Sequence, residues 1–104
     1  MIRHCVMLRL ARKADRKVLD RVMLALGALV DRLDGCSNFC AGPNRDYEDK
    51  SPDVAYGFTL DARDARALAA YAVNPEHQVL GAKLVNLCEG GAEGIIVYDI
   101  EVGP

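Results

Sequence analysis

The feature that most constrains the fold is a long amphipathic pattern near the start of the chain. Apolar side chains recur there at steps of three and four residues, which places them on one face of a helix. Asp15 is suited to cap its first turn, and Gly35 supplies the left-handed residue that commonly ends a helix. The apolar stripe consists of Val18, Leu19, Val22, Met23, Leu26, Leu29, Val30 and Leu33.

Segments of alternating character flank this helix and predict strands. Between Met1 and Leu10, the even-numbered side chains form one face, and His4 is the only polar residue on it. Three further strands are predicted at Cys36–Gly42, Val54–Leu60 and Glu93–Val102.

A second helical region is interrupted in its middle. Asp61 is predicted to cap a helix that continues to about Val73. Asn74 and Pro75 then break the pattern, but asparagine is a good N-cap and proline suits the first position of a new helix. A third helix is therefore predicted from Pro75 to about Cys88, with inward-facing Val79, Leu80, Leu84 and Leu87.

The order of these elements predicts the fold class. A chain of 104 residues forms one domain, residues 1–104. The order β-α-β-β-α-β, with the second helix broken in two, predicts an α+β ferredoxin-like fold. Its four-stranded antiparallel sheet carries all helices on one side.

The uncovered face of this sheet predicts a homodimer. We expect the helices to cover the even-numbered residues of the first, third and last strands, including Tyr98 and Ile100. The open face then has an apolar centre and a charged rim, where Arg3 can pair with Asp99 or Glu101. Such a surface is typical of a protein interface, although a monomer with a half-exposed sheet is the alternative. The apolar centre consists of Cys5, Met7, Ala55, Gly57, Ile95 and Val97.

Composition and cysteine spacing exclude several function classes. The net charge of −2 gives no general attraction to nucleic acid or to an anionic membrane. Arg3, His4 and Arg9 interrupt the first apolar run, which excludes a secretory segment or a membrane span there. The four cysteines include no Cys-x-x-Cys pair, so we expect reduced thiols in a cytoplasmic protein. No residue pattern specifies a metal or a cofactor.

Three segments together resemble the stress-responsive dimeric α/β-barrel (Dabb) family. They are the opening Ile2-Arg3-His4 strand, Gly42-Pro43-Asn44, and the run from Ala67 to His77 that contains Tyr71-Ala-Val-Asn-Pro-Glu-His77. The resemblance covers nearly the whole chain and implies a homodimer whose two sheets face each other in a barrel.

The family resemblance also implies candidate site residues. Most members have no assigned activity, but one branch contains a plant polyketide cyclase that closes its substrate by aldol condensation. Its catalytic tyrosine and histidine match Tyr71 and His77, and its first-strand histidine matches His4. Asn74 stands where that enzyme has a histidine.

These residue types suit proton abstraction without a metal. On one straight helix, six residues would separate Tyr71 and His77 by about 240°, but the break at Pro75 lets both approach His4. The helix dipole and partial burial should both keep His77 neutral, so that it can act as a base. The Tyr71 hydroxyl can then donate to a carbonyl or a developing enolate.

Other functions remain open at this point. The same pocket can bind a small hydrophobic ligand without catalysis, or the chain can be a stress-associated, purely structural homodimer with no pocket. His4 and His77 can also be core histidines that satisfy neighbouring polar groups. The leading hypothesis is a cofactor-independent enzyme acting on a small hydrophobic carbonyl compound, with His77, Tyr71 and His4 as catalytic residues.

Overall fold

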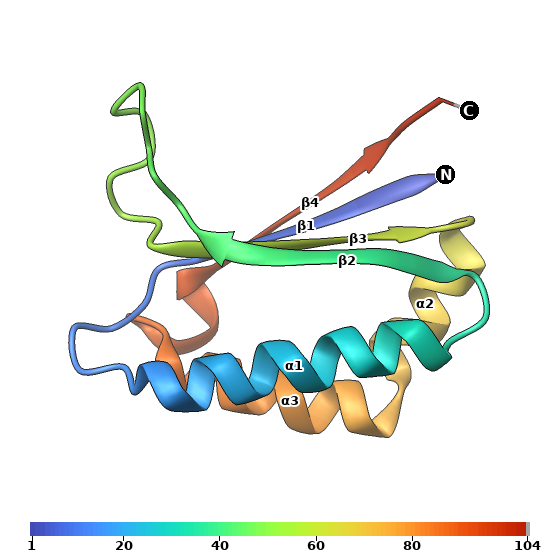
Figure 1. Cartoon of the computed structure of the whole chain (residues 1–104), viewed down its shortest axis with the longest axis horizontal. Coiled ribbons are helices and arrows are strands. Elements are labelled where there is room, and N and C mark those ends of the chain that lie inside the picture. The colour runs from blue at the N-terminus through green and yellow to red at the C-terminus, as the bar shows by residue number, and fades with distance from the viewer. Residues whose placement is uncertain (104) are drawn as a thin grey trace.

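The structure, a computed structural model, describes residues 1–103 and contains the predicted order of elements (Figure 1). A short 3-10 turn, η1, precedes the last strand. The elements are β1 (Ile2–Leu8), α1 (Arg16–Arg32), β2 (Cys36–Pro43), β3 (Tyr56–Ala62), α2 (Ala65–Val73), α3 (Pro75–Leu87), η1 (Gly91–Gly94) and β4 (Ile95–Glu101).

The sheet has the strand order β2-β3-β1-β4, and every neighbouring pair is antiparallel. All three α-helices lie on one side of it, and no helix or strand among residues 1–103 covers the other side (Figure 1). The predicted α+β ferredoxin-like fold is therefore confirmed. We call the helix-free side the open face.

The first helix has the predicted ends and the predicted buried stripe. The Asp15 carboxylate accepts a hydrogen bond from the Lys17 amide at 2.9 Å. Gly35 has a φ of +83°, and a side chain there would meet the Cβ of Ala67 at 2.8 Å. Glycine is thus required at this turn both for its backbone conformation and for its lack of a side chain. The stripe buries Leu19, Val22, Met23, Leu26, Leu29 and Val30.

The break between α2 and α3 is also as predicted. The Asn74 side chain accepts hydrogen bonds from the amides of Glu76 at 2.9 Å and His77 at 3.2 Å. Pro75 occupies the start of α3, where no amide donor is needed. This arrangement turns the chain sharply between Tyr71 and His77.

Two details of these helices differ from the prediction. Asp64, and not Asp61, caps α2 by accepting from the Ala67 amide at 2.9 Å, because β3 continues through Ala62. Val79 is 58% exposed, whereas Leu80, Leu84 and Leu87 are buried. Adjacent helical positions are about 100° apart, so a helix that buries Leu80 turns Val79 toward solvent.

The predicted faces of the last strand are wrong. His4, Val6 and Leu8 face the helices, and their partners across the β1–β4 ladder are Asp99, Val97 and Ile95. Directly paired residues share a face of the sheet, so the odd-numbered residues of β4 lie on the helix side. Consequently Ile96, Tyr98 and Ile100 lie on the open face with Cys5 and Met7. Hydrophobic alternation favoured the wrong face, because the odd-numbered set contains the acidic residues Asp99 and Glu101 and yet lies on the helix side.

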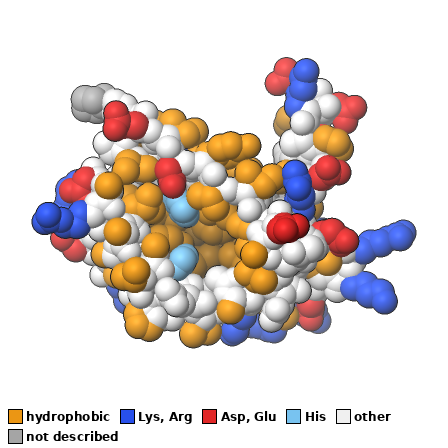
Figure 2. Space-filling view, turned by 180° about the vertical axis from the view of Figure 1, so that it is seen from behind, with side chains coloured by type: hydrophobic (Ala, Val, Ile, Leu, Met, Phe, Trp, Pro, Cys, Tyr) orange, Lys and Arg blue, Asp and Glu red, His pale blue; other side chains and the backbone are white. Residues whose placement is uncertain are grey.

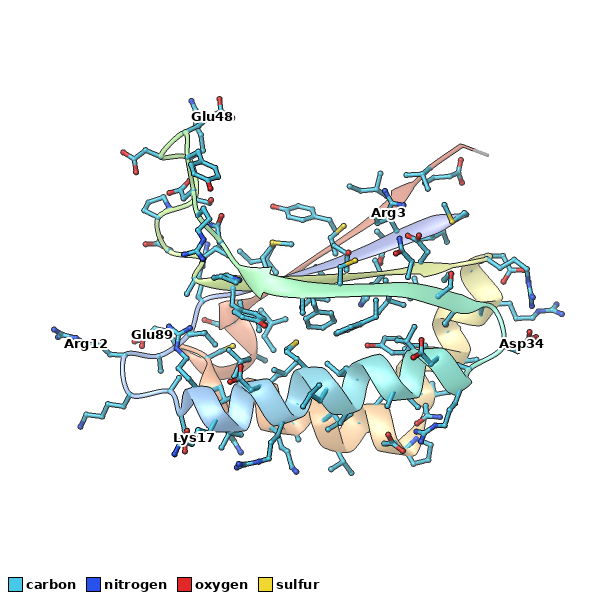
Figure 3. The ribbon with its side chains drawn as sticks, in the orientation of Figure 1. Arg3, Arg12, Lys17, Asp34, Glu48 and Glu89 are labelled. Carbon is cyan, nitrogen blue, oxygen red and sulfur yellow. The ribbon has the colours of Figure 1, made fainter. Side chains whose placement is uncertain are left out.

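The predicted partner of Arg3 is wrong for the same reason. Arg3 forms two hydrogen bonds with Asp61 of β3, at 2.8 and 3.2 Å, instead of pairing with Asp99 or Glu101. Asn38 donates a third bond to the Asp61 carboxylate at 3.0 Å. Arg3 points away from the helices (Figure 3), so this buried carboxylate ties β1, β2 and β3 together on the open face.

No helix in residues 1–103 combines the length and the apolar character that crossing a membrane requires.

Candidate functional site

His4 reaches the space between the sheet and the helices from the middle of β1. Its Nδ1 lies 2.6 Å from an Asp99 carboxylate oxygen on β4. A carboxylate has no hydrogen to donate, so Nδ1 of His4 is the donor in this hydrogen bond. Asp99 therefore fixes the orientation of the His4 ring.

Tyr71 and His77 approach His4 from α2 and α3. The ring centroids of Tyr71 and His77 are 4.2 Å apart, and those of His4 and Tyr71 are 5.9 Å apart in an edge-to-face arrangement. His77 Nδ1 lies 3.1 Å from the Ala72 carbonyl oxygen, just before the helix break. The structure thus brings the three predicted site residues together.

These side chains line a small pocket of about 350 Å³. Both histidines of the chain are visible beside a hollow with hydrophobic walls (Figure 2). No lysine or arginine of residues 1–103 lines the pocket. A pocket-free interior, which would favour a purely structural role, is therefore not observed. The lining residues are His4, Ala65, Leu68, Ala69, Tyr71, Ala72, His77 and Asp99.

Burial influences the protonation of His77 and Tyr71. It lowers the pKa of His77 below its usual range, and nearby His4 lowers it further, although the bond to the Ala72 carbonyl opposes this. His77 is thus the neutral imidazole at pH 7. Burial also raises the pKa of Tyr71 well above its usual range, so its hydroxyl keeps its proton.

The Tyr71 hydroxyl is the least satisfied polar group in the core. Tyr71 is 1% exposed, and its hydroxyl has no hydrogen-bond partner among residues 1–103. A buried hydroxyl without a partner costs about 1–3 kcal/mol.

Asp99 is the site residue that sequence reasoning missed. It was expected on the open face, because the faces of the last strand were exchanged. One signal could have found it: a lone histidine on the buried face of β1 needs a polar partner, and β4 was predicted to be the neighbour of β1.

The described residues contain no group of three or more histidine, cysteine or acidic side chains arranged to hold a metal ion. Cys5, Cys36, Cys40 and Cys88 are all free thiols, and none lines the pocket. The chemistry available at this site is that of two imidazoles, a phenol and a carboxylate.

The fold and this pocket define a ferredoxin-like domain with a His-Tyr-His cluster between its sheet and its helices. The family model described as the stress responsive A/B barrel domain (Dabb) matches residues 2–102. The chain therefore belongs to the Dabb family. No curated protein matches the chain.

Solved structures share the whole fold. A dimeric ferredoxin-like protein of unknown function from Jannaschia sp. CCS1 is 42% identical, with a TM-score of 0.93, and the match covers 97% of this chain and 98% of that one. At3g17210 from Arabidopsis thaliana is 13% identical, with a TM-score of 0.84 and coverage of 100% and 97%. The hydroxynitrile lyase from Passiflora edulis is 15% identical, with a TM-score of 0.82 and coverage of 98% and 93%.

Proposed function

We propose that this protein is a cofactor-independent enzyme that removes a proton from a small, uncharged carbonyl compound. The observation that carries the proposal is that His77 and Tyr71 line one apolar pocket, and that the buried Tyr71 hydroxyl has no partner among residues 1–103. The Passiflora edulis lyase shows that an enzyme can be built on this fold.

His77 is the proposed base. Its Nδ1–H donates to the Ala72 carbonyl, which leaves the lone pair of Nε2 free to accept a proton. The position of His77 in the first turn of α3 disfavours the imidazolium before the reaction, as burial does. An imidazole of lowered pKa remains largely unprotonated at neutral pH and is ready to act.

Tyr71 is the proposed hydrogen-bond donor. When Nε2 of His77 takes a proton from the carbon beside the carbonyl, the electron pair of the broken C–H bond forms an enolate. The Tyr71 hydroxyl donates to the enolate oxygen, where the negative charge develops. Its high pKa keeps the proton on the phenol, so Tyr71 stabilises the charge as a neutral donor.

His4 and Asp99 complete the proposed site at its sheet side. The Asp99 carboxylate holds the His4 ring edge-on to Tyr71. His4 is therefore proposed to position the Tyr71 ring and to contact the bound compound. The apolar wall of Ala65, Leu68, Ala69 and Ala72 favours an uncharged hydrocarbon portion of the substrate.

We also propose that the protein acts as a homodimer through the open face. The Jannaschia protein is a dimer and is 42% identical to this chain. On the open face, Tyr98 and Ile100 are more than half exposed beside Met7 and Ile96. A second copy would remove this apolar surface from water.

The proposed activity can be tested by isotope exchange. Phenylacetone is a small uncharged ketone, and its benzylic protons exchange slowly without a catalyst. In D2O, the enzyme should return a deuteron to the enolate, and proton NMR would record the loss of the benzylic signal. We expect exchange with the native protein and a loss of at least 100-fold with His77→Ala, because general-base catalysis contributes about 10²–10⁴-fold.

Phenylacetone also serves for the control variant and for testing the alternative function, which is ligand binding without catalysis. Val79→Ala changes a nearby residue of α3 that is 58% exposed and should exchange at the native rate. Equal exchange by the native protein and His77→Ala would contradict the proposed base. If phenylacetone raises the melting temperature without any exchange, the pocket is instead a non-catalytic site for small apolar ligands.

A further inference from the structure

The connection between β2 and β3 stands away from the sheet on the side opposite the helices (Figure 1). It spans residues 44–55, and we call it the β2–β3 arm. Glu48 lies at its far end (Figure 3). The arm therefore extends past the open face, into the space that a second subunit would occupy.

The arm is held in shape by its own side chains. Asn44 donates to the Ser51 hydroxyl and to the Val54 carbonyl, both at 2.9 Å. The Asp46 carboxylate accepts from the amides of Lys50 at 2.8 Å and Ser51 at 2.9 Å. These bonds, chiefly those from Ser51, lower the pKa of Asp46. The arm is thus organised before any partner binds.

The tip of the arm presents an aromatic side chain to solvent. Tyr47 is 93% exposed, and no hydrogen bond joins its hydroxyl to another residue in the described part of the chain. Tyrosine is enriched in the energetically dominant parts of protein interfaces, since it brings a large contact area with little flexibility. Because Tyr47 is 93% exposed, it buries almost none of its surface within the isolated protomer.

The arm and the open face also form one continuous concave surface. A recess of about 580 Å³ lies between them. Its floor contains Met7, Gly57, Ile96 and Tyr98 from the open face, and its wall contains Lys50 and Asp53 from the arm. A second copy seated on the open face would therefore meet the arm as well.

We propose that the β2–β3 arm is an intersubunit clasp, in which Tyr47 of each protomer packs against the second copy of this chain. The inference rests on the proposed homodimer and adds the surface that holds it together. Because a two-fold dimer repeats each contact, the arm of each protomer contacts the other protomer.

A single tryptophan can report on the clasp, because the native chain has none. We would measure the emission of Tyr47→Trp over a dilution series and follow the same samples by sedimentation velocity. The emission should shift to shorter wavelength as the dimer forms. Leu24→Trp is the matched control, since Leu24 is 76% exposed on α1 in the helix layer, and its emission should not change with dimerisation.

Removal of the Tyr47 side chain beyond Cβ completes the test. Tyr47→Ala should raise the dimer dissociation constant at least tenfold, whereas Leu24→Ala should leave it unchanged. Circular dichroism would check folding, which an exposed Tyr47 should not affect. A stable dimer in which the Tyr47→Trp emission stays that of a solvent-exposed indole, or whose affinity survives Tyr47→Ala, overturns the clasp alone. A native protein that is monomeric at every concentration overturns the homodimer and the clasp together.

Discussion

The Tyr71 hydroxyl is a buried polar group for which the protein itself provides no partner in residues 1–103. In the absence of ligand it should therefore lower the free energy of unfolding. A polar group kept in the core at such a cost is commonly retained for function. The same hydroxyl that weakens the free protein is the one proposed to hold the enolate oxygen.

Tyr71→Phe tests this trade-off. Removing an unsatisfied hydroxyl should raise the free energy of unfolding by about 1 kcal/mol, while deuterium exchange on phenylacetone falls at least tenfold. Urea unfolding at a fixed protomer concentration measures the change in the free energy of unfolding. Leu24→Ala, at an exposed position of α1, should change neither quantity. A loss of stability above about 1 kcal/mol in Tyr71→Phe would show that the hydroxyl has a structural partner.

The lowered pKa of His77 predicts the pH dependence of the activity. Nε2 accepts a proton only when His77 is neutral, so exchange should rise with pH through a value below 6.5, the ordinary pKa of histidine. It should then be level from pH 7 to pH 8. A rate that keeps rising over that interval would mean that another group is the base.

At the scale of the element, the break between α2 and α3 aligns His77 with Tyr71. The Asn74 side chain caps α3 through the amides of Glu76 and His77, which defines where the His77 backbone begins its helix. The ion pair between Arg32 and Glu76, with contacts of 2.8 and 2.9 Å, joins the end of α1 to the start of α3.

Asn74→Ala should remove this cap. We expect the free energy of unfolding to fall by about 1 kcal/mol, because that is a typical cost of losing an N-cap. Asn74→Ser keeps an oxygen that can accept from the same amides and should restore most of the stability. Thermal or urea unfolding of both variants makes the comparison. Equal stability of the native protein and Asn74→Ala would contradict the role of the cap.

A helix or strand could be predicted from the sequence when its pattern clearly distinguished a buried face from an exposed face. In α1 the large apolar residues lie on one face, with the exposed Leu24 as the exception, and the Asn74-Pro75 pair is a specific signal for the start of a helix. The last strand reads Ile95-Ile96-Val97-Tyr98, which is apolar on both faces, so its orientation had to come from pairing with β1. The candidate residues His4, Tyr71 and His77 came from the family resemblance, whereas finding Asp99 depended on the faces of the ambiguous last strand.

At the scale of the whole molecule, the open face predicts the assembly. Met7 lies on this face on the inner strand β1 and Tyr98 on the edge strand β4, and both are away from the pocket. Tyr98→Asp should weaken the proposed dimer at least 100-fold, because it places a charge in an apolar interface. Sedimentation equilibrium would measure the change, and Leu24→Asp on α1 should have no effect. An unchanged association constant for Tyr98→Asp would place the interface elsewhere.

The proposed reaction requires that His77 is a neutral base with its Nε2 free. A long-range nitrogen–proton NMR spectrum of the uniformly 15N-labelled protein reports the protonation and tautomer of an imidazole. The chain has only two histidines, so His77→Gln assigns both sets of signals. At pH 7 we expect a neutral His77 with its proton on Nδ1. A protonated ring, or a proton on Nε2, would contradict it.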